Sequence, residues 1–467
     1  MAIVKPRTPA GVLELLPGQQ MAFQRMLDEI RAGYERFGFL PVETPALELT
    51  DILLTKSGGE TERQVYYVQS SGAWEQRQRI KMGLRFDLTV PLARYVAQHE
   101  GHLTFPFRRY QIQRVYRGES AQRGRFREFY QCDIDVVGKD TLSLIHDAEI
   151  PAVVHHVFER LEIGAFTIHI NNRKLLLGLL DALGVDSSTV RTLVLREIDK
   201  LAKVGPEKVA AALTEDIGLT PEAADGIMQF VSIDGAAREV MERLEHMNID
   251  SPEFQQGLDE LRTVVQEAGG FGIPESDLVI DVSIARGLDY YTGTVYETFL
   301  DDHPEIGSIC SGGRYDNLAG HFTRSRLPGV GISIGATRLF SQLSDLGLIE
   351  PPPARTQVLV TLFDPDLLHD CADVAGRLRG DGIDTEMVLE KRKLGKQLKY
   401  AQRQGIRFVT ILGPDERDRG TVRLKDLATT RQYEVQLDAL SDLVLHLLSG
   451  RNDLPPGLVA PTSEEGA

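Results

Sequence analysis

The chain has 467 residues, a formal net charge of −16, 42% hydrophobic residues and 26% charged residues. The length predicts two or three domains, and the composition is typical of a soluble globular protein. The acidic balance argues against a protein that coats nucleic acid, and no run of 18 or more apolar residues predicts a membrane-spanning helix.

Targeting and redox signals are sparse. The N-terminus has the pattern of neither a signal peptide nor a transit peptide. The three cysteines, Cys132, Cys310 and Cys371, are far apart and odd in number, which indicates neither a disulfide framework nor a zinc site. We therefore expect a reducing, cytoplasmic setting.

The positive charge is concentrated in two stretches. Residues 108–127 contain seven arginines and one acid, Glu119, and residues 391–407 contain seven basic residues and no acid. Such stretches suit phosphate binding within an acidic protein. Ordinary solvated surface is the alternative.

In chain order, apolar residues at helical spacing predict a helix over 19–37, which ends at Gly38. From 65 to 136 the period changes to two, which predicts mostly strands. A helix is predicted at about 141–161 and a strand over 166–172.

The second half begins with a helical segment over about 173–270, followed by a strand at 277–285. The run PPPART at 351–356 predicts a linker. Beyond it, short apolar strands alternate with helical patterns, which predicts an α/β domain with a partly parallel sheet. The Pro/Gly-rich residues 450–467 are predicted to be disordered.

Alternation along two predicted strands separates apolar from polar side chains. Over 84–89, the polar face would hold Arg85, Asp87 and Thr89. Over 127–136 the polar face holds one arginine, one ring, one amide and two acids, namely Arg127, Phe129, Gln131, Asp133 and Asp135. Acids and an amide suit a ligand with N–H donors, and a ring among them suits a flat ligand. A solvated face is the commoner alternative.

Residues 113–129 predict a strand, an arginine-rich loop and a second strand, and arginine forks match phosphate and carboxylate oxygens. Residues 329–340 predict a glycine-rich strand that runs into a helix, with Arg338 in its first turn. A cation is unfavourable there unless an anion lies beside it. The glycines could instead serve close packing. The chain contains no P-loop, HExxH, CxxC or nucleophile-elbow motif.

A bend between two predicted strands, ARGLDYYTGTVYE at 285–297, holds one arginine and two adjacent tyrosines. This stretch and SGGRYDNL at 311–318 resemble the two signatures of the histidyl-tRNA synthetase family. The segments YRGE and RFREF resemble class II motif 2, GISIGATRL resembles motif 3, and the N-terminal helix with Pro45 resembles motif 1. The resemblance spans roughly 5–448.

The resemblance implies an α+β fold, in which helices flank the antiparallel catalytic sheet of class II synthetases. It places the first part of the catalytic core at 1–172, a helical insertion domain at 173–270, the second part of the core at 271–348, an α/β anticodon-binding domain at 355–448 and a disordered tail at 449–467. It also implies a homodimer formed around motif 1, with tRNA(His) as a partner. The basic stretch 391–407 would then meet the anticodon stem.

By the same resemblance, Arg286 and Arg117 would be catalytic at the α-phosphate. The ATP site would comprise Arg117, Glu119, Arg125, Phe129 and Arg338. Histidine would be held by Asp87, Thr89, Gln131, Asp135, Tyr290 and Tyr291. Asp87 and Asp135 stand where many bacterial members have glutamate.

The implied reaction has two steps: histidine and ATP, with Mg²⁺, give histidyl-adenylate and pyrophosphate, and the terminal ribose of the tRNA then takes the histidine. Two other readings stay open. A regulatory subunit of ATP phosphoribosyltransferase resembles the catalytic core, but it generally lacks the anticodon domain and intact signatures. A prolyl or threonyl enzyme shares the class II motifs but not RGLDYY with GGRYD.

Overall fold

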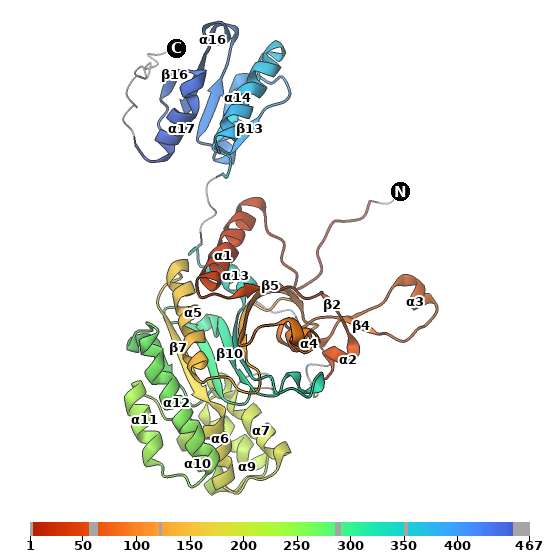
Figure 1. Ribbon diagram of the computed structural model, residues 1–467, viewed down its shortest axis with the longest axis vertical. Helices are drawn as coiled ribbons and strands as arrows, with labels where there is room; N and C mark the ends of the chain where they lie inside the picture. The colour runs from red at the N-terminus through yellow and green to blue at the C-terminus, as the bar shows by residue number, and fades with distance from the viewer. Residues whose placement is uncertain (1–2, 56–63, 121–123, 285–290, 350–353, 452–467) are drawn as a thin grey trace. The chain divides into compact units, whose positions relative to one another are not determined.

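The structure is a computed structural model that describes residues 3–55, 64–120, 124–284, 291–349 and 354–451. The chain divides into two compact units, Met1–Leu15 with Phe23–Ile349 and Leu16–Ala22 with Glu350–Ala467. Each unit has its own sheet (Figure 1). In the described part of the chain, no helix has the length and apolar character needed to cross a membrane.

The first unit is built on an eight-stranded sheet in the order β1-β5-β6-β11-β10-β9-β7-β8. Its strands are β1 (Leu40–Pro41), β5 (Phe107–Tyr116), β6 (Glu128–Val137), β7 (Phe166–Asn172), β8 (Leu278–Ile280), β9 (Thr294–Leu300), β10 (Cys310–Tyr315) and β11 (Gly329–Ile334). Along this order, every pair of neighbouring strands from β5 through β6, β11, β10 and β9 to β7 is antiparallel. The two edge pairs, β1–β5 and β7–β8, are parallel. The predicted antiparallel core is confirmed.

Helices cover the apolar side of β6. The predicted helix over 19–37 is α1 (Pro17–Arg36), and the Tyr34 hydroxyl donates to the Cys132 carbonyl at 2.9 Å. The ring of Phe23 lies 5.6 Å from that of Tyr130 and 5.0 Å from that of Phe340 in α13 (Ala336–Asp345). One face of β6 is therefore buried by helices, as the period-two alternation of its sequence predicts.

The prediction of mostly strands over 65–136 is partly wrong. A small three-stranded sheet in the order β2-β4-β3 is interrupted by helices. Its elements are β2 (Leu47–Leu49), α2 (Thr50–Leu53), β3 (Tyr67–Val68), α3 (Ser71–Glu75), β4 (Met82–Leu84) and α4 (Thr89–His99). The strand predicted over 277–285 is also shorter: β8 ends at Ile280, and a turn follows.

The predicted helix at 141–161 is α5 (Ile145–Leu161). The segment 173–270 is helical, as predicted, and gathers at one end of the first unit (Figure 1). Its helices are α6 (Arg173–Ala182), α7 (Ser188–Ile198), α8 (Leu201–Val204), α9 (Pro206–Glu215), α10 (Pro221–Val231), α11 (Ala237–His246) and α12 (Pro252–Gly270). Helix α12 packs against α5, α6 and β7, so this segment rests on the far edge of the main sheet.

The second unit has a five-stranded sheet in the order β13-β12-β14-β15-β16. Its strands and helices are β12 (Val358–Val360), α14 (Leu368–Gly380), β13 (Thr385–Met387), α15 (Leu394–Gln404), β14 (Phe408–Ile411), α16 (Pro414–Arg419), β15 (Thr421–Asp426), β16 (Gln432–Gln436) and α17 (Leu440–Leu448). The pairs β13–β12 and β12–β14 are parallel, and the rest are antiparallel. This confirms the predicted partly parallel α/β domain.

Candidate active site

Polar side chains cross the middle of the main sheet in rows. Three residues of β5, Arg109, Gln111 and Gln113, lie opposite three residues of β6, Asp135, Asp133 and Gln131. Strand β11 extends two of the rows, with Ser333 opposite Asp133 and Gly331 opposite Asp135. Paired residues share a face, so these side chains are neighbours.

This polar face is buried rather than solvated. Asp133 and Asp135 are each 3% exposed, and Arg109 is 0% exposed. Gln131 Nε2 donates to Ser333 Oγ at 2.9 Å, while Gln131 Oε1 and Asp133 Oδ1 are buried with no hydrogen-bond partner among the described residues. Buried acceptors without partners cost free energy unless a ligand pairs with them, which favours a lined pocket over the solvated alternative.

The strand predicted over 84–89 is wrong beyond Leu84. The chain turns after β4, and Thr89 begins α4. Asp87, which precedes the N-cap residue Leu88, accepts from the Val90 amide through Oδ1 at 3.2 Å, and Pro91 lies in the first turn, so a carboxylate bonded to a first-turn amide and a proline favour a helix here. Asp87 Oδ2 is buried with no hydrogen-bond partner in the described part of the chain.

A cavity of about 300 Å³ opens beside the end of these rows. Six of the predicted site residues line it, namely Arg117, Glu119, Arg125, Phe129, Gln131 and Arg338. They come from β6, from the loop between β5 and β6, and from α13. Ser308, Ser311 and Ser333 add hydroxyl groups to the wall.

The side chains of this cavity are held by their own contacts. Arg117 Nε donates to the Phe86 carbonyl at 3.0 Å, and its guanidinium lies 5.1 Å from the ring centroid of Phe129. Arg125 Nη1 lies 3.4 Å from Glu119 Oε2, and Arg338 donates to the Ile306 carbonyl. Three arginines around one glutamate give a positive cavity that suits an anion. Arg338 in the first turn of α13, as predicted, adds its charge to the positive end of that helix.

Asp135 lies one row further along the sheet and does not line this cavity. It pairs with Arg109 at 2.6 Å and accepts from the Tyr315 hydroxyl at 2.8 Å. Burial raises the pKa of the Asp135 carboxyl to about 7, against the opposing effect of Arg109. Burial likewise raises the pKa of Asp87 to about 7, and Arg117 opposes it. Asp87 therefore lies within electrostatic range of the cavity.

Two glycines that face each other across β10 and β11 lie against two of the predicted site residues, Gly313 against Tyr291 and Gly331 against Asp135. Gly313 pairs with Gly331. A Cβ on Gly313 would lie 2.9 Å from Tyr291 Cδ1, and a Cβ on Gly331 would lie 2.2 Å from Asp135 Oδ1. Both clashes are prohibitive, so the missing side chains provide the space in which Tyr291 and Asp135 lie.

The predicted site residues thus fall into three groups. Six line the cavity, and four others lie within the described residues but do not line it: Asp87, Thr89, Asp135 and Tyr291. Arg286 and Tyr290 lie outside the described residues.

Sequence reasoning missed Arg109 and Tyr315 as partners of Asp135. Alternation along 107–116 could have placed Arg109 on a polar face, whereas nothing local in the sequence joins Tyr315 to Asp135. Among the described residues, no group of three or more His, Cys, Asp or Glu could hold a metal ion.

Asp135 is expected to make the stability of this unit depend on pH. Its folded pKa is about 7, above about 3.9 for an unfolded aspartate. The folded state therefore holds this proton up to a higher pH than the unfolded state does. The resulting contribution to the free energy of unfolding is fully present below about pH 4 and is lost as the pH rises to about 7. We expect the free energy of unfolding of the wild type to fall, relative to Asp135→Asn, by about 1.4 kcal/mol per pH unit between about pH 5 and 7. Urea unfolding at half-unit pH steps measures this, and parallel curves would contradict it.

The antiparallel sheet carries an arginine-bearing loop between β5 and β6, and its glycine-rich strand β11 leads into the arginine-bearing helix α13. This arrangement defines a class II aminoacyl-tRNA synthetase core. A family model described as histidyl-tRNA synthetase matches residues 11–339, and one described as anticodon binding domain matches residues 357–447. The chain belongs to the histidyl-tRNA synthetase family.

Relatives agree with this. The chain is 55% identical to a histidine--tRNA ligase of Xanthomonas campestris pv. campestris (strain 8004), over 98% of this chain and 100% of that protein. The crystal structure of histidyl-tRNA synthetase from Nostoc sp. PCC 7120 has a TM-score of 0.84 and 42% identity, and covers 95% of this chain and 100% of that one. A structure described as an ATP phosphoribosyltransferase regulatory subunit/histidyl-tRNA synthetase, from Bacillus halodurans C, has a TM-score of 0.69 at 21% identity over 85% of this chain and 97% of that one, which shows a shared fold alone.

Proposed function

We propose that this chain is a histidine–tRNA ligase, which activates histidine with ATP and transfers it to the 3′ end of tRNA(His). Membership of the histidyl-tRNA synthetase family supports this over nearly the whole chain. The single structural observation that carries it is the arginine-lined cavity, which adjoins two buried acceptors, Gln131 Oε1 and Asp133 Oδ1, that have no hydrogen-bond partner among the described residues.

ATP would occupy the cavity. The adenine ring would stack on Phe129, with its amine on Glu119, because an aromatic face and a carboxylate oxygen suit those groups. Arg117 and Arg286 would hold the α-phosphate, and Arg125 and Arg338 the outer phosphates. Mg²⁺ would enter on the phosphates of ATP, because this ion prefers phosphate oxygens with one or two carboxylates, and would neutralise phosphate charge.

Histidine would lie along the polar rows. Its ammonium group suits Asp87, Thr89 and Gln131, since Asp87 Oδ2 and Gln131 Oε1 are buried acceptors without a hydrogen-bond partner in the described residues. Its imidazole would contact Asp135, Tyr290 and Tyr291. A site built to pair polar groups rejects analogues that lack them by ~10⁴–10⁵.

The first step would need no general base, because the attacking carboxylate of histidine is already an anion. One of its oxygens bonds to the α-phosphorus, the bond from that phosphorus to the bridging oxygen breaks, and pyrophosphate leaves. The arginines would neutralise and align the phosphates in this step. In the second step the terminal ribose hydroxyl of the tRNA attacks the activated carbonyl, loses its proton, and AMP leaves.

The other parts of the chain would serve the tRNA and assembly. Residues 173–270 would form the insertion domain and 355–448 the anticodon-binding domain, while the remaining parts of 1–348 would form the catalytic core. Six basic side chains near α15 are exposed and suit an RNA backbone, namely Lys391, Arg392, Lys393, Lys396, Lys399 and Arg403. Exposed apolar side chains at Leu40, Leu49, Tyr67 and Trp74 support a homodimer around motif 1. A cytoplasmic location fits three free, buried cysteines.

Pyrophosphate exchange into ATP, with each amino acid offered separately, tests the first step. We expect exchange with histidine and with no other amino acid, followed by charging of tRNA(His). Folded protein that gives no exchange with any amino acid would overturn the proposal and favour a regulatory, non-catalytic role on the same fold.

A further inference from the structure

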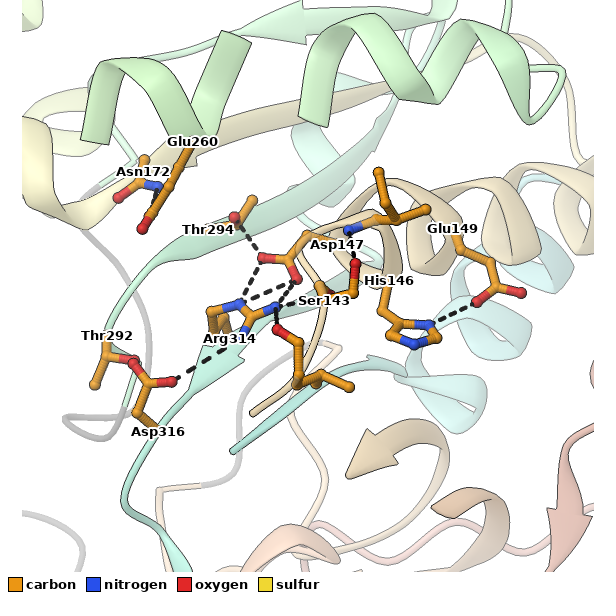
Figure 2. Close-up of polar contacts among 12 residues, drawn as sticks. Ser143, His146, Asp147, Glu149, Asn172, Glu260, Thr292, Thr294, Arg314 and Asp316 are labelled. Atoms are coloured by element: carbon orange, nitrogen blue, oxygen red, sulfur yellow. Dashed lines mark hydrogen bonds and ion pairs between the residues drawn. The ribbon is translucent and has the colours of Figure 1, made fainter. Parts of the chain in front are cut away.

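The two signature stretches of the sequence interlock residue by residue. The Thr292 amide donates to the Arg314 carbonyl at 2.8 Å, and the Thr292 hydroxyl donates to Asp316 Oδ2 at 2.6 Å. The ring of Tyr291 lies against Gly313. Figure 2 shows Thr292 and Asp316 facing each other beside Arg314. Three successive contacts thus fasten the segment just before β9, which contains Tyr291 and Thr292, to the end of β10.

The end of β10 is itself anchored to α5. Arg314 Nε donates to both carboxylate oxygens of Asp147, at 3.0 and 3.1 Å, and Nη2 donates to Asp147 Oδ1 at 2.6 Å (Figure 2). The Thr294 hydroxyl donates to Asp147 Oδ2 at 2.7 Å, so β9 shares the same carboxylate. Asp147 is 0% exposed. A planar fork held by a buried carboxylate has little freedom, which gives the contacts at Thr292 a rigid base.

We propose that the Thr292–Asp316 pair is a latch that positions Tyr291 for histidine, so that these two residues set the affinity for the amino acid and not for ATP. The inference rests on the proposed function, in which Tyr291 contacts the imidazole. The latch lies one residue from Tyr291, whereas neither Thr292 nor Asp316 lines the arginine cavity. A displaced tyrosine would therefore weaken histidine binding and leave the phosphate contacts in place.

The test uses the full chain in pyrophosphate exchange. Thr292→Val keeps the shape of the side chain and removes its hydroxyl, and Asp316→Asn removes the charge of the acceptor. We expect each to raise the KM for histidine about tenfold, with kcat and the KM for ATP changed less than about twofold. Thr292→Ser restores the hydroxyl and should return the KM for histidine to within about twofold of the wild type. Asp316→Asn keeps an amide oxygen that accepts more weakly from the Thr292 hydroxyl, and it also removes the ion pair of Asp316 with Arg314 Nη1 at 4.0 Å. Because the two changes act on the same bond, the double variant should raise the KM for histidine by less than the product of the two single effects.

A matched control exists elsewhere in the first unit. Thr167 Oγ1 donates to Asp301 Oδ1 at 2.7 Å, at the opposite end of β9 from Thr292, so Thr167→Val should leave both KM values unchanged. Equal changes in both KM values, or an unchanged KM for histidine in folded Thr292→Val and Asp316→Asn, would overturn the latch while the wild type remains active. A wild type without histidine-dependent exchange would overturn the proposed function, and the latch with it.

Discussion

Replacement of Arg117 by alanine is expected to lower kcat for histidine-dependent pyrophosphate exchange by about 10²–10³-fold. The guanidinium of Arg117 lies on the cavity wall, oriented by the Phe86 carbonyl and the ring of Phe129. A donor held in advance toward the developing phosphate charge stabilises the transition state more than the bound substrates, so most of the loss should fall on kcat. Arg117→Lys keeps the positive charge but loses the planar guanidinium, so its kcat should lie between those of the wild type and Arg117→Ala.

Arg114, near the end of β5, offers a control three residues before Arg117. Its guanidinium lies 5.2 Å from the ring of Tyr130 and pairs with Glu128 at 3.0 Å, so its surroundings resemble those of Arg117. Its side chain is 53% exposed, however, and does not line the cavity. Arg114→Ala should change kcat by less than about twofold. Equal losses in the two alanine variants would contradict a specific role for Arg117.

Replacement of Arg314 by leucine is expected to destabilise the first unit by about 3–5 kcal/mol. The substitution leaves the Asp147 carboxylate, which is 0% exposed, without its cation. The side chain of Arg314 also donates to the carbonyls of Leu142 and Ser143, at 3.3 and 3.2 Å, and these acceptors would lose their partner as well. Breaking a buried pair from one side costs far more than the pair contributes, because a charge stays buried.

Hydrogen exchange measured on peptides from β9, β10 and α5 over a urea series gives the free energy of opening of this region. Arg31 provides a matched control: it pairs with Asp28 at the same 2.6 Å, but the two side chains are 40% and 53% exposed. Arg31→Leu should cost less than about 1 kcal/mol. Adding Asp147→Leu to Arg314→Leu should recover part of the loss. Similar losses in the two leucine single variants would show that burial is not the cause.

Much of the site could be predicted from local patterns. Alternation placed Gln131, Asp133 and Asp135 on one face of a strand because the side-chain period of a strand is fixed at two, and the structure pairs them with polar residues of β5. The strand-to-helix pattern over 329–340 placed Arg338 in a first helical turn for a similar reason. These are short-range features, set by the backbone geometry of the segment itself.

Other features depend on contacts that a local pattern does not contain. The segment 84–89 also alternates, yet α4 begins at Thr89, where the Asp87 carboxylate accepts from the Val90 amide and Pro91 favours a first helical turn, so these local preferences override the strand pattern. In the basic stretch 391–407, Arg407 pairs with the buried Asp426 at 3.0 Å and so stabilises the fold of the second unit. The bond from Tyr315 to Asp135 joins residues 180 positions apart. Its existence follows from the order of strands in the sheet, which periodicity does not determine.

In the proposed histidine site, the facing glycines of β10 and β11 also limit how the preference for an amino acid could change. Gly313 and Gly331 have no side chain left to shorten, so the wall beside Tyr291 and Asp135 already recedes as far as the backbone allows. Mutation at these two positions can only narrow the space. Among the described residues, shortening Tyr291 or Tyr315 would enlarge this proposed site, and shortening Tyr315 would remove its hydrogen bond to Asp135.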